Sequence, residues 1–156
     1  MLDQILVPLE GAALAECVLP HAKAIAQSMG AHLMFLHVLE QEISGKSYQV
    51  DPLNWYLRKV EAQSYMDQVS QQWQQSSLPI TNVLLEGPAA ERVVEYAHDH
   101  NVDLVVLSSQ SQSGVAQKVI WQVGKSIMLV RAQWPAENSL NLSLNEMRYS
   151  RILIPL

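Results

Sequence analysis

The sequence of 156 residues is short of cysteine, of charge and of long hydrophobic runs. Its single cysteine, Cys17, excludes a disulfide framework within the chain and is typical of a reducing compartment. No apolar stretch approaches the roughly 20 residues that a membrane span requires, and no charged-then-apolar leader precedes the first apolar run. The formal net charge of −5 disfavours nucleic-acid binding, which needs a basic surface. We therefore expect a cytoplasmic protein that binds neither membranes nor nucleic acids.

Hydrophobic residues are plentiful, at 49% of the chain, and many of them gather in five short apolar runs. These runs cover residues 5–9, 33–39, 83–85, 104–107 and 127–130. Most of them lack the alternation of a half-exposed strand, so we predict strands that are buried on both faces.

Helical patterns lie between the predicted strands. The first ends at Gly30, and its apolar residues share one helix face: Leu14, Val18, Ala22, Ile25 and Met29. The pair Asp51-Pro52 is typical of a helix start. The helix that it opens carries its own apolar stripe, formed by Ala62, Met66, Val69 and Trp73.

Two further helices complete the pattern. Gly87-Pro88 opens one, which Asn101 ends in a left-handed conformation, and residues 115–123 form the other. Repeated strand-helix-strand units require parallel strands, and right-handed crossovers make the fold a three-layer, doubly wound α/β sheet. Ligands bind such sheets at the carboxyl ends of the strands, where the strand order reverses. The segments of interest are therefore residues 10–12 and 108–114.

Several short segments carry specific motifs. The first predicted strand runs into Glu10-Gly11, and the second ends in His37-Val38-Leu39-Glu40. Further motifs cover residues 103–109, 115–120 and 127–131. These segments resemble those of universal stress proteins, in the order in which that family has them, with Glu10-Gly11 where the family has Asp-Gly. The resemblance covers residues 1 to about 131. It implies a five-stranded sheet of order 3-2-1-4-5, of the adenine-nucleotide alpha-hydrolase-like kind.

The resemblance also implies a site for ATP or AMP between the first and fourth strands. Glu10 would face the ribose and the backbone of Val38 the adenine, while three residues would face the phosphates: Ser109, Ser113 and Gly114. The predicted site is completed by Pro8, Leu9 and Ser108.

The loop after the fourth strand departs from the family pattern. ATP-binding members carry Gly-x2-Gly-x9-Gly-Ser/Thr, in which glycines let backbone N–H groups approach phosphates. Here Ser108 and Ser111 stand at the first two glycine positions, and the third falls on Trp121. We therefore predict a degenerate site with no tightly bound nucleotide. A phosphate site and a solvated, serine-rich turn are equally good interpretations of residues 108–113.

Other reactive side chains have plainer interpretations. Cys17 and His21 share a helix face, but a core cysteine beside a surface histidine is far commoner than a nucleophilic pair. His98 and His100 suit the carboxyl end of a helix and are seldom metal ligands there. We expect no catalytic and no metal-binding residue.

The end of the sequence carries a repeat of its beginning. Residues 150–156 match residues 3–9 at four of seven positions. We predict a domain over residues 1–132, a linker over 133–150 and the first strand of a truncated second domain over 151–156. This arrangement resembles tandem universal stress proteins.

Three functions remain open. The first is a stress-response module that binds an adenine nucleotide weakly. The second is a nucleotide-independent interaction module, which the resemblance implies would form a homodimer through the strand from Ile127 to Arg131, or a pseudo-dimer with a second domain. The third is a slow ATPase, which we rank last because no residue is placed to activate water.

Overall fold

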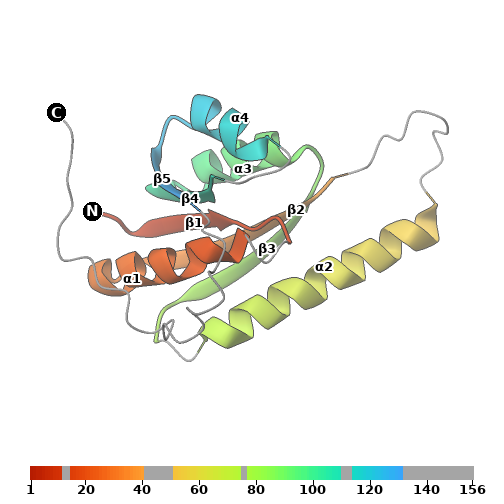
Figure 1. Cartoon of the computed structure of the whole chain (residues 1–156), viewed down its shortest axis with the longest axis horizontal. Coiled ribbons are helices and arrows are strands. Elements are labelled where there is room, and N and C mark those ends of the chain that lie inside the picture. The colour runs from red at the N-terminus through yellow and green to blue at the C-terminus, as the bar shows by residue number, and fades with distance from the viewer. Residues whose placement is uncertain (12–14, 41–50, 75–76, 110–113, 132–156) are drawn as a thin grey trace.

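The computed structural model describes residues 1–11, 15–40, 51–74, 77–109 and 114–131. Their centre is a five-stranded sheet of order β3-β2-β1-β4-β5, in which every neighbouring pair is parallel (Figure 1). The strands are β1 (Gln4–Pro8), β2 (His32–Leu39), β3 (Ile80–Glu86), β4 (Leu104–Ser108) and β5 (Ser126–Val130). The predicted sheet and strand order are confirmed.

Helices cover both faces of the sheet and give the predicted three layers. They are the 3-10 turn η1 (Ala15–Val18) and the helices α1 (Leu19–Met29), α2 (Pro52–Trp73), α3 (Ala89–Asp99) and α4 (Val115–Gln122). In Figure 1, α1 and α2 lie on one face and α3 and α4 on the other. Within the described residues, no helix is long and apolar enough to cross a membrane.

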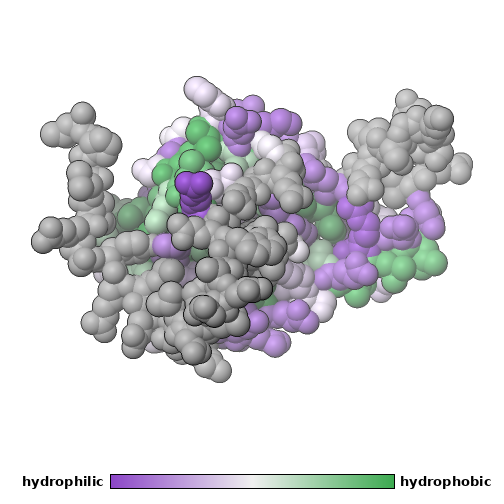
Figure 2. All heavy atoms as spheres, viewed as in Figure 1, coloured by the Kyte–Doolittle hydropathy of each residue, from purple (hydrophilic) through white to green (hydrophobic). Residues whose placement is uncertain are grey.

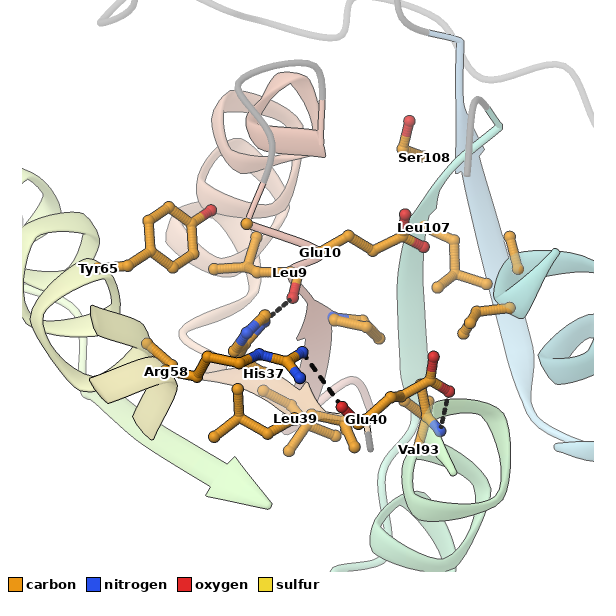
Figure 3. A pocket seen from close by; sticks show the side chains of 18 of the residues that line it. Leu9, Glu10, His37, Leu39, Glu40, Arg58, Tyr65, Val93, Leu107 and Ser108 are labelled. Atoms are coloured by element: carbon orange, nitrogen blue, oxygen red, sulfur yellow. Dashed lines mark hydrogen bonds between the residues drawn. The ribbon is translucent and has the colours of Figure 1, made fainter. Parts of the chain in front are cut away.

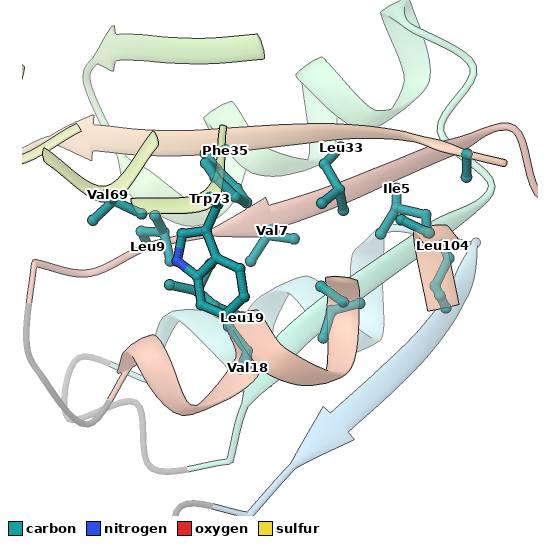
Figure 4. Packing of buried hydrophobic residues seen from close by; sticks show 14 of the residues in the cluster. Ile5, Val7, Leu9, Val18, Leu19, Leu33, Phe35, Val69, Trp73 and Leu104 are labelled. Carbon is teal, nitrogen blue, oxygen red and sulfur yellow. The ribbon is translucent and has the colours of Figure 1, made fainter. Parts of the chain in front are cut away.

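The strands at the centre of the sheet are buried on both faces, as predicted. Ile5, Leu6 and Val7 of β1 have no exposed surface. Ile5 and Val7 point toward α1 and α2, where they join a core that includes Trp73 (Figure 4), and Leu6 points toward α3 and α4. This alternation follows from the two-residue period of a strand, so an apolar run of three fills two separate cores.

The helix signals are confirmed where the structure describes them. Asp51 accepts a hydrogen bond from the N–H of Leu53 at 3.0 Å and so caps α2. Gly30 ends α1 with a φ of 67°, and Asn101 follows α3 with a φ of 49°, both in the left-handed region. The predicted stripe of α2 is buried at each position: Ala62, Met66, Val69 and Trp73.

Three details differ from the prediction. The first helix opens with a 3-10 turn and becomes α-helical at Leu19, directly before Pro20, because proline fits a helix only in its first turn. Met29 belongs to the predicted apolar face of the first helix but is 54% exposed, because it is the last residue of α1. The strand β3 begins at Ile80, three residues before the predicted start, since Thr81 and Asn82 interrupt its apolar pattern.

Candidate functional site

A cavity of about 580 Å³ lies at the carboxyl ends of β1, β2 and β4 (Figure 3). This is where the strand order reverses, because β1 has β2 on one side and β4 on the other. Five of the predicted site residues line it: Pro8, Leu9, Glu10, Val38 and Ser108.

Of the other three predicted residues, the two that the structure describes, Ser109 and Gly114, are not part of this lining. The N–H of Ser109 donates to the carbonyl of Val130 at 2.9 Å, which ties the end of β4 to β5. Gly114 has a φ of 69° and starts α4, whose first residues Val115 and Ala116 reach the cavity. Ser113 falls outside the described residues, as do the predicted linker and second-domain strand.

His37 fixes the turn that follows β1. Its Nδ1 lies 2.6 Å from the carbonyl oxygen of Leu9, and because a carbonyl can only accept, Nδ1 carries the proton. The imidazole meets Tyr65 of α2 edge-on, with ring centroids 6.0 Å apart. Its Cε1 would lie 3.6 Å from a Cβ at Gly11, whose φ of 76° favours glycine in any case. The backbone of residues 9–11 is therefore held in place at the cavity floor by a side chain from β2.

Glu40 directly follows β2 and joins three elements beside the cavity. Its Oε1 accepts a hydrogen bond from the N–H of Ala89, the first residue of α3, at 2.8 Å. Its backbone carbonyl accepts from Arg58 Nη2 of α2 at 3.2 Å (Figure 3). A carboxylate at this position also interacts favourably with the positive end of the helix dipole. Glu40 thus connects the end of β2 to both helix layers.

The charges around the cavity are mostly negative. Among the described residues, three carboxylates line it, from Glu10, Glu40 and Glu61, together with one guanidinium, from Arg58. Anions bind best where positive charge or free N–H groups meet them. The described lining therefore favours a ligand of low negative charge over a polyphosphate.

Cys17 lies beside the β4 end of the cavity. Its thiol is hydrogen-bonded to the Ser108 side chain, and partial burial raises the pKa of this thiol above its ordinary value. Burial likewise lowers the pKa of His21. A thiol that stays protonated at neutral pH is a poor nucleophile, which agrees with the structural interpretation of Cys17.

Metal ligation has no support in the part of the chain that the structure describes. There, no group of three His, Cys, Asp or Glu side chains is placed to hold a metal ion. His100 instead stacks on Tyr96, with ring centroids 3.8 Å apart, and its Nδ1 lies 3.1 Å from the Tyr96 carbonyl oxygen.

Sequence reasoning missed the residues that α2 brings to the cavity: Arg58, Glu61 and Tyr65. Their spacing shows only that they lie on similar sides of one helix, and the position of α2 over the sheet depends on tertiary packing. His37 and Glu40 were visible in the motif at the end of β2, but their hydrogen-bonding roles were not.

Comparison with known proteins assigns this fold to a family. The model of the Universal stress protein family matches residues 1–131. No curated protein shows significant similarity to the chain.

Solved structures of this family share the fold. The universal stress protein UspA from Lactobacillus plantarum has 23% identity and a TM-score of 0.72, over 83% of this chain and 98% of that one. A universal stress protein from Archaeoglobus fulgidus in complex with dAMP has 20% identity and a TM-score of 0.65, over 83% and 98%. A universal stress protein family protein from Arabidopsis thaliana with AMP bound has 10% identity and a TM-score of 0.65, over 84% and 92%.

Proposed function

This chain belongs to the universal stress protein family, and we propose that it is a stress-response module that binds an adenine nucleotide weakly in the cavity between β1 and β4. The observation that carries the proposal is the cavity of about 580 Å³ at the point where the strand order reverses. Two relatives of the same fold are solved with dAMP and AMP.

The adenine would lie at the β2 end of the cavity. β1 pairs with β2 only as far as Leu36, whose carbonyl accepts from the Leu9 N–H at 2.8 Å. Backbone groups two residues apart in a strand point the same way, so the N–H and C=O of Val38 face the cavity beyond the end of β1. Such a pair of groups suits the edge of a purine, and Ala62 of α2 adds an apolar wall beside it. The Glu10 carboxylate would accept hydrogen bonds from ribose hydroxyls.

The phosphates would be held poorly. Serine replaces glycine at positions 108 and 111, and a Cβ there hinders the approach of backbone N–H groups to phosphate. The carboxylates of Glu10 and Glu61 lie on the same lining and repel added negative charge. We therefore expect AMP to bind at least as tightly as ATP.

Isothermal titration of the chain with AMP and with ATP tests this function. We expect measurable binding of AMP, weakened about tenfold by Glu10→Ala through the loss of a hydrogen bond to a charged acceptor. Glu91→Ala is the control, because Glu91 is an exposed carboxylate on α3 that does not line the cavity. A micromolar dissociation constant for ATP would contradict the weak phosphate site. The absence of binding for both nucleotides would leave the interaction module as the function.

An interaction module through β5 is the second candidate, and the edge of the sheet favours it. β5 pairs with β4 on one side only and is the last strand of the sheet, so its other edge offers backbone donors and acceptors. Leu129 on this strand is 50% exposed, and Trp121 of α4 is 85% exposed. A homodimer across β5, or a pseudo-dimer with a second domain, would cover them. Light scattering at micromolar concentration tests this: Leu129→Lys should reduce the mass to that of a monomer, and a wild-type monomer would refute it.

A further inference from the structure

The helix α2 has an apolar stripe on each of two opposite sides. One stripe is buried against the sheet, as described above. The other consists of four exposed residues of its first half: Leu53, Tyr56, Leu57 and Val60, with exposed fractions of 65%, 63%, 52% and 48%. At 100° per residue these four positions lie within about 100° of one another, opposite the buried stripe. We call them the outer stripe, and Figure 2 shows part of this apolar surface at the beginning of α2.

The outer stripe is confined to the half of α2 that lies away from the sheet. In Figure 1 the beginning of α2 extends beyond the carboxyl ends of β2 and β3. Farther along the same side of the helix, the exposed residues are polar: Ser64, Asp67 and Gln71. A helix that needed only to cover the sheet would be polar along its whole outer side. Apolar patches of this kind on a protein surface are often functional.

We propose that the outer stripe binds the outer stripe of a second copy of this chain, with the two α2 helices antiparallel. The spacing of the four residues is three, one and three, which reads the same in both directions. A two-fold axis between positions 56 and 57 therefore sets Leu53 against the partner's Val60 and Tyr56 against the partner's Leu57. Such self-matching is what an isologous interface requires. A parallel pair, whose two-fold axis runs along the helices, would instead set each residue of the stripe against its own copy.

The area of the outer stripe sets the strength of this contact. From their exposed fractions, the four residues together have a solvent-exposed area on the order of 400 Å² per copy. Two copies would bury about 800 Å², which is below the roughly 1,200 Å² of a stable interface. The pair should therefore be weak and concentration-dependent. It is separate from a dimer across β5, because β5 lies at the other edge of the sheet from β3 and α2 (Figure 1).

Disulfide trapping tests the arrangement directly. In a Cys17→Ser background, Leu57→Cys places a thiol next to the proposed axis, so oxidation should yield a covalent dimer. Gln71→Cys is the matched control, since it lies on the same side of the same helix. In the antiparallel pair the two Gln71 positions are more than about 40 Å apart, at 1.5 Å per residue, and should not cross-link. Cross-linking at both positions, or at neither, would overturn the proposal.

Sedimentation equilibrium of the chain carrying Leu129→Lys gives an independent measurement, because this change removes any association across β5. We expect a concentration-dependent dimer that Leu57→Glu reduces at least tenfold in affinity and that Gln71→Glu leaves unchanged. Circular dichroism confirms that both variants keep the fold. Strict monomers at millimolar concentration, or equal effects of the two substitutions, would contradict the contact.

Discussion

The hydrogen bond from the Ala89 N–H to Glu40 should stabilise the domain by about 1 kcal/mol. The residue before α3 is Pro88, which has no side-chain donor or acceptor and makes no cap. Glu40 supplies the missing acceptor from the end of β2, at 2.8 Å. The substitution Glu40→Ala removes it and leaves the first N–H of α3 to water.

The magnitude follows from the two parts of the interaction. Loss of a capping acceptor costs about 1 kcal/mol, within a range of 0.5–2. Of this, the charge of the carboxylate at the helix dipole contributes about 0.5 kcal/mol, since Glu40 is exposed and screened. Glu40→Gln keeps an acceptor without the charge. We therefore expect losses of about 1 kcal/mol for Glu40→Ala and about half of that for Glu40→Gln.

Urea unfolding followed by circular dichroism measures both losses. The midpoint should fall in the order wild type, Glu40→Gln, Glu40→Ala, with an unchanged slope. Glu61→Ala, which removes another exposed carboxylate of the cavity, should change the free energy of unfolding by less than about 0.5 kcal/mol. Equal effects of Glu40→Ala and Glu61→Ala would refute the capping role.

Three further outcomes follow from the structure. The carboxylate of Asp103 accepts from the N–H groups of Asp3 and Gln4 at 2.9 and 3.0 Å, and these bonds hold its pKa below the ordinary value. Its stabilising effect is therefore present above the unfolded-state pKa of about 4 and is lost as the pH falls through the lower folded-state pKa. Asp103→Asn should lower the urea midpoint at pH 7, and at strongly acid pH the midpoints of the variant and the wild type should be equal. Met66→Ala empties a fully buried site and should cost about 3 kcal/mol at constant urea slope. Gly30→Ala forces a side chain into a φ of 67° with nothing within 4 Å to clash, so thermal unfolding should show a loss of only about 1 kcal/mol from backbone strain.

The sequence predicted the sheet well because its signals are local. Unbroken apolar runs mark strands buried on both faces, and Asp51, Gly30 and Asn101 mark helix ends through their own backbone chemistry. The strand order came from the resemblance to universal stress proteins. The edge strand β3 was predicted too short, because a half-buried edge strand admits polar residues such as Thr81 and Asn82.

The lining of the cavity was predicted in part, because only the residues at the strand ends follow from topology. Residues at or directly after the carboxyl ends of β1, β2 and β4 lie at this edge of the sheet, and Glu10 and Val38 are examples. Arg58 and Tyr65 reach it only because α2 packs against β2 and β3 and extends past their carboxyl ends, which no local pattern specifies. The prediction for Ser113 remains a prediction.

The polar residues at the end of β2 bind the protein itself. His37 donates a hydrogen bond to the carbonyl of Leu9. The side chain of Glu40 accepts from the first N–H of α3, and its backbone carbonyl accepts from the guanidinium of Arg58. These contacts hold the proposed adenine end of the cavity in shape without a ligand. The described part of the loop that would hold phosphates, which is Ser108, Ser109 and Gly114, contributes none of them. Changes in that loop can therefore weaken phosphate binding while the adenine end stays formed. We expect Glu40→Ala to weaken AMP and ATP binding by the same factor. Ser108→Gly should instead strengthen the binding of ATP selectively, because it lets a phosphate approach the backbone. Equal gains for AMP and ATP in Ser108→Gly would contradict this separation.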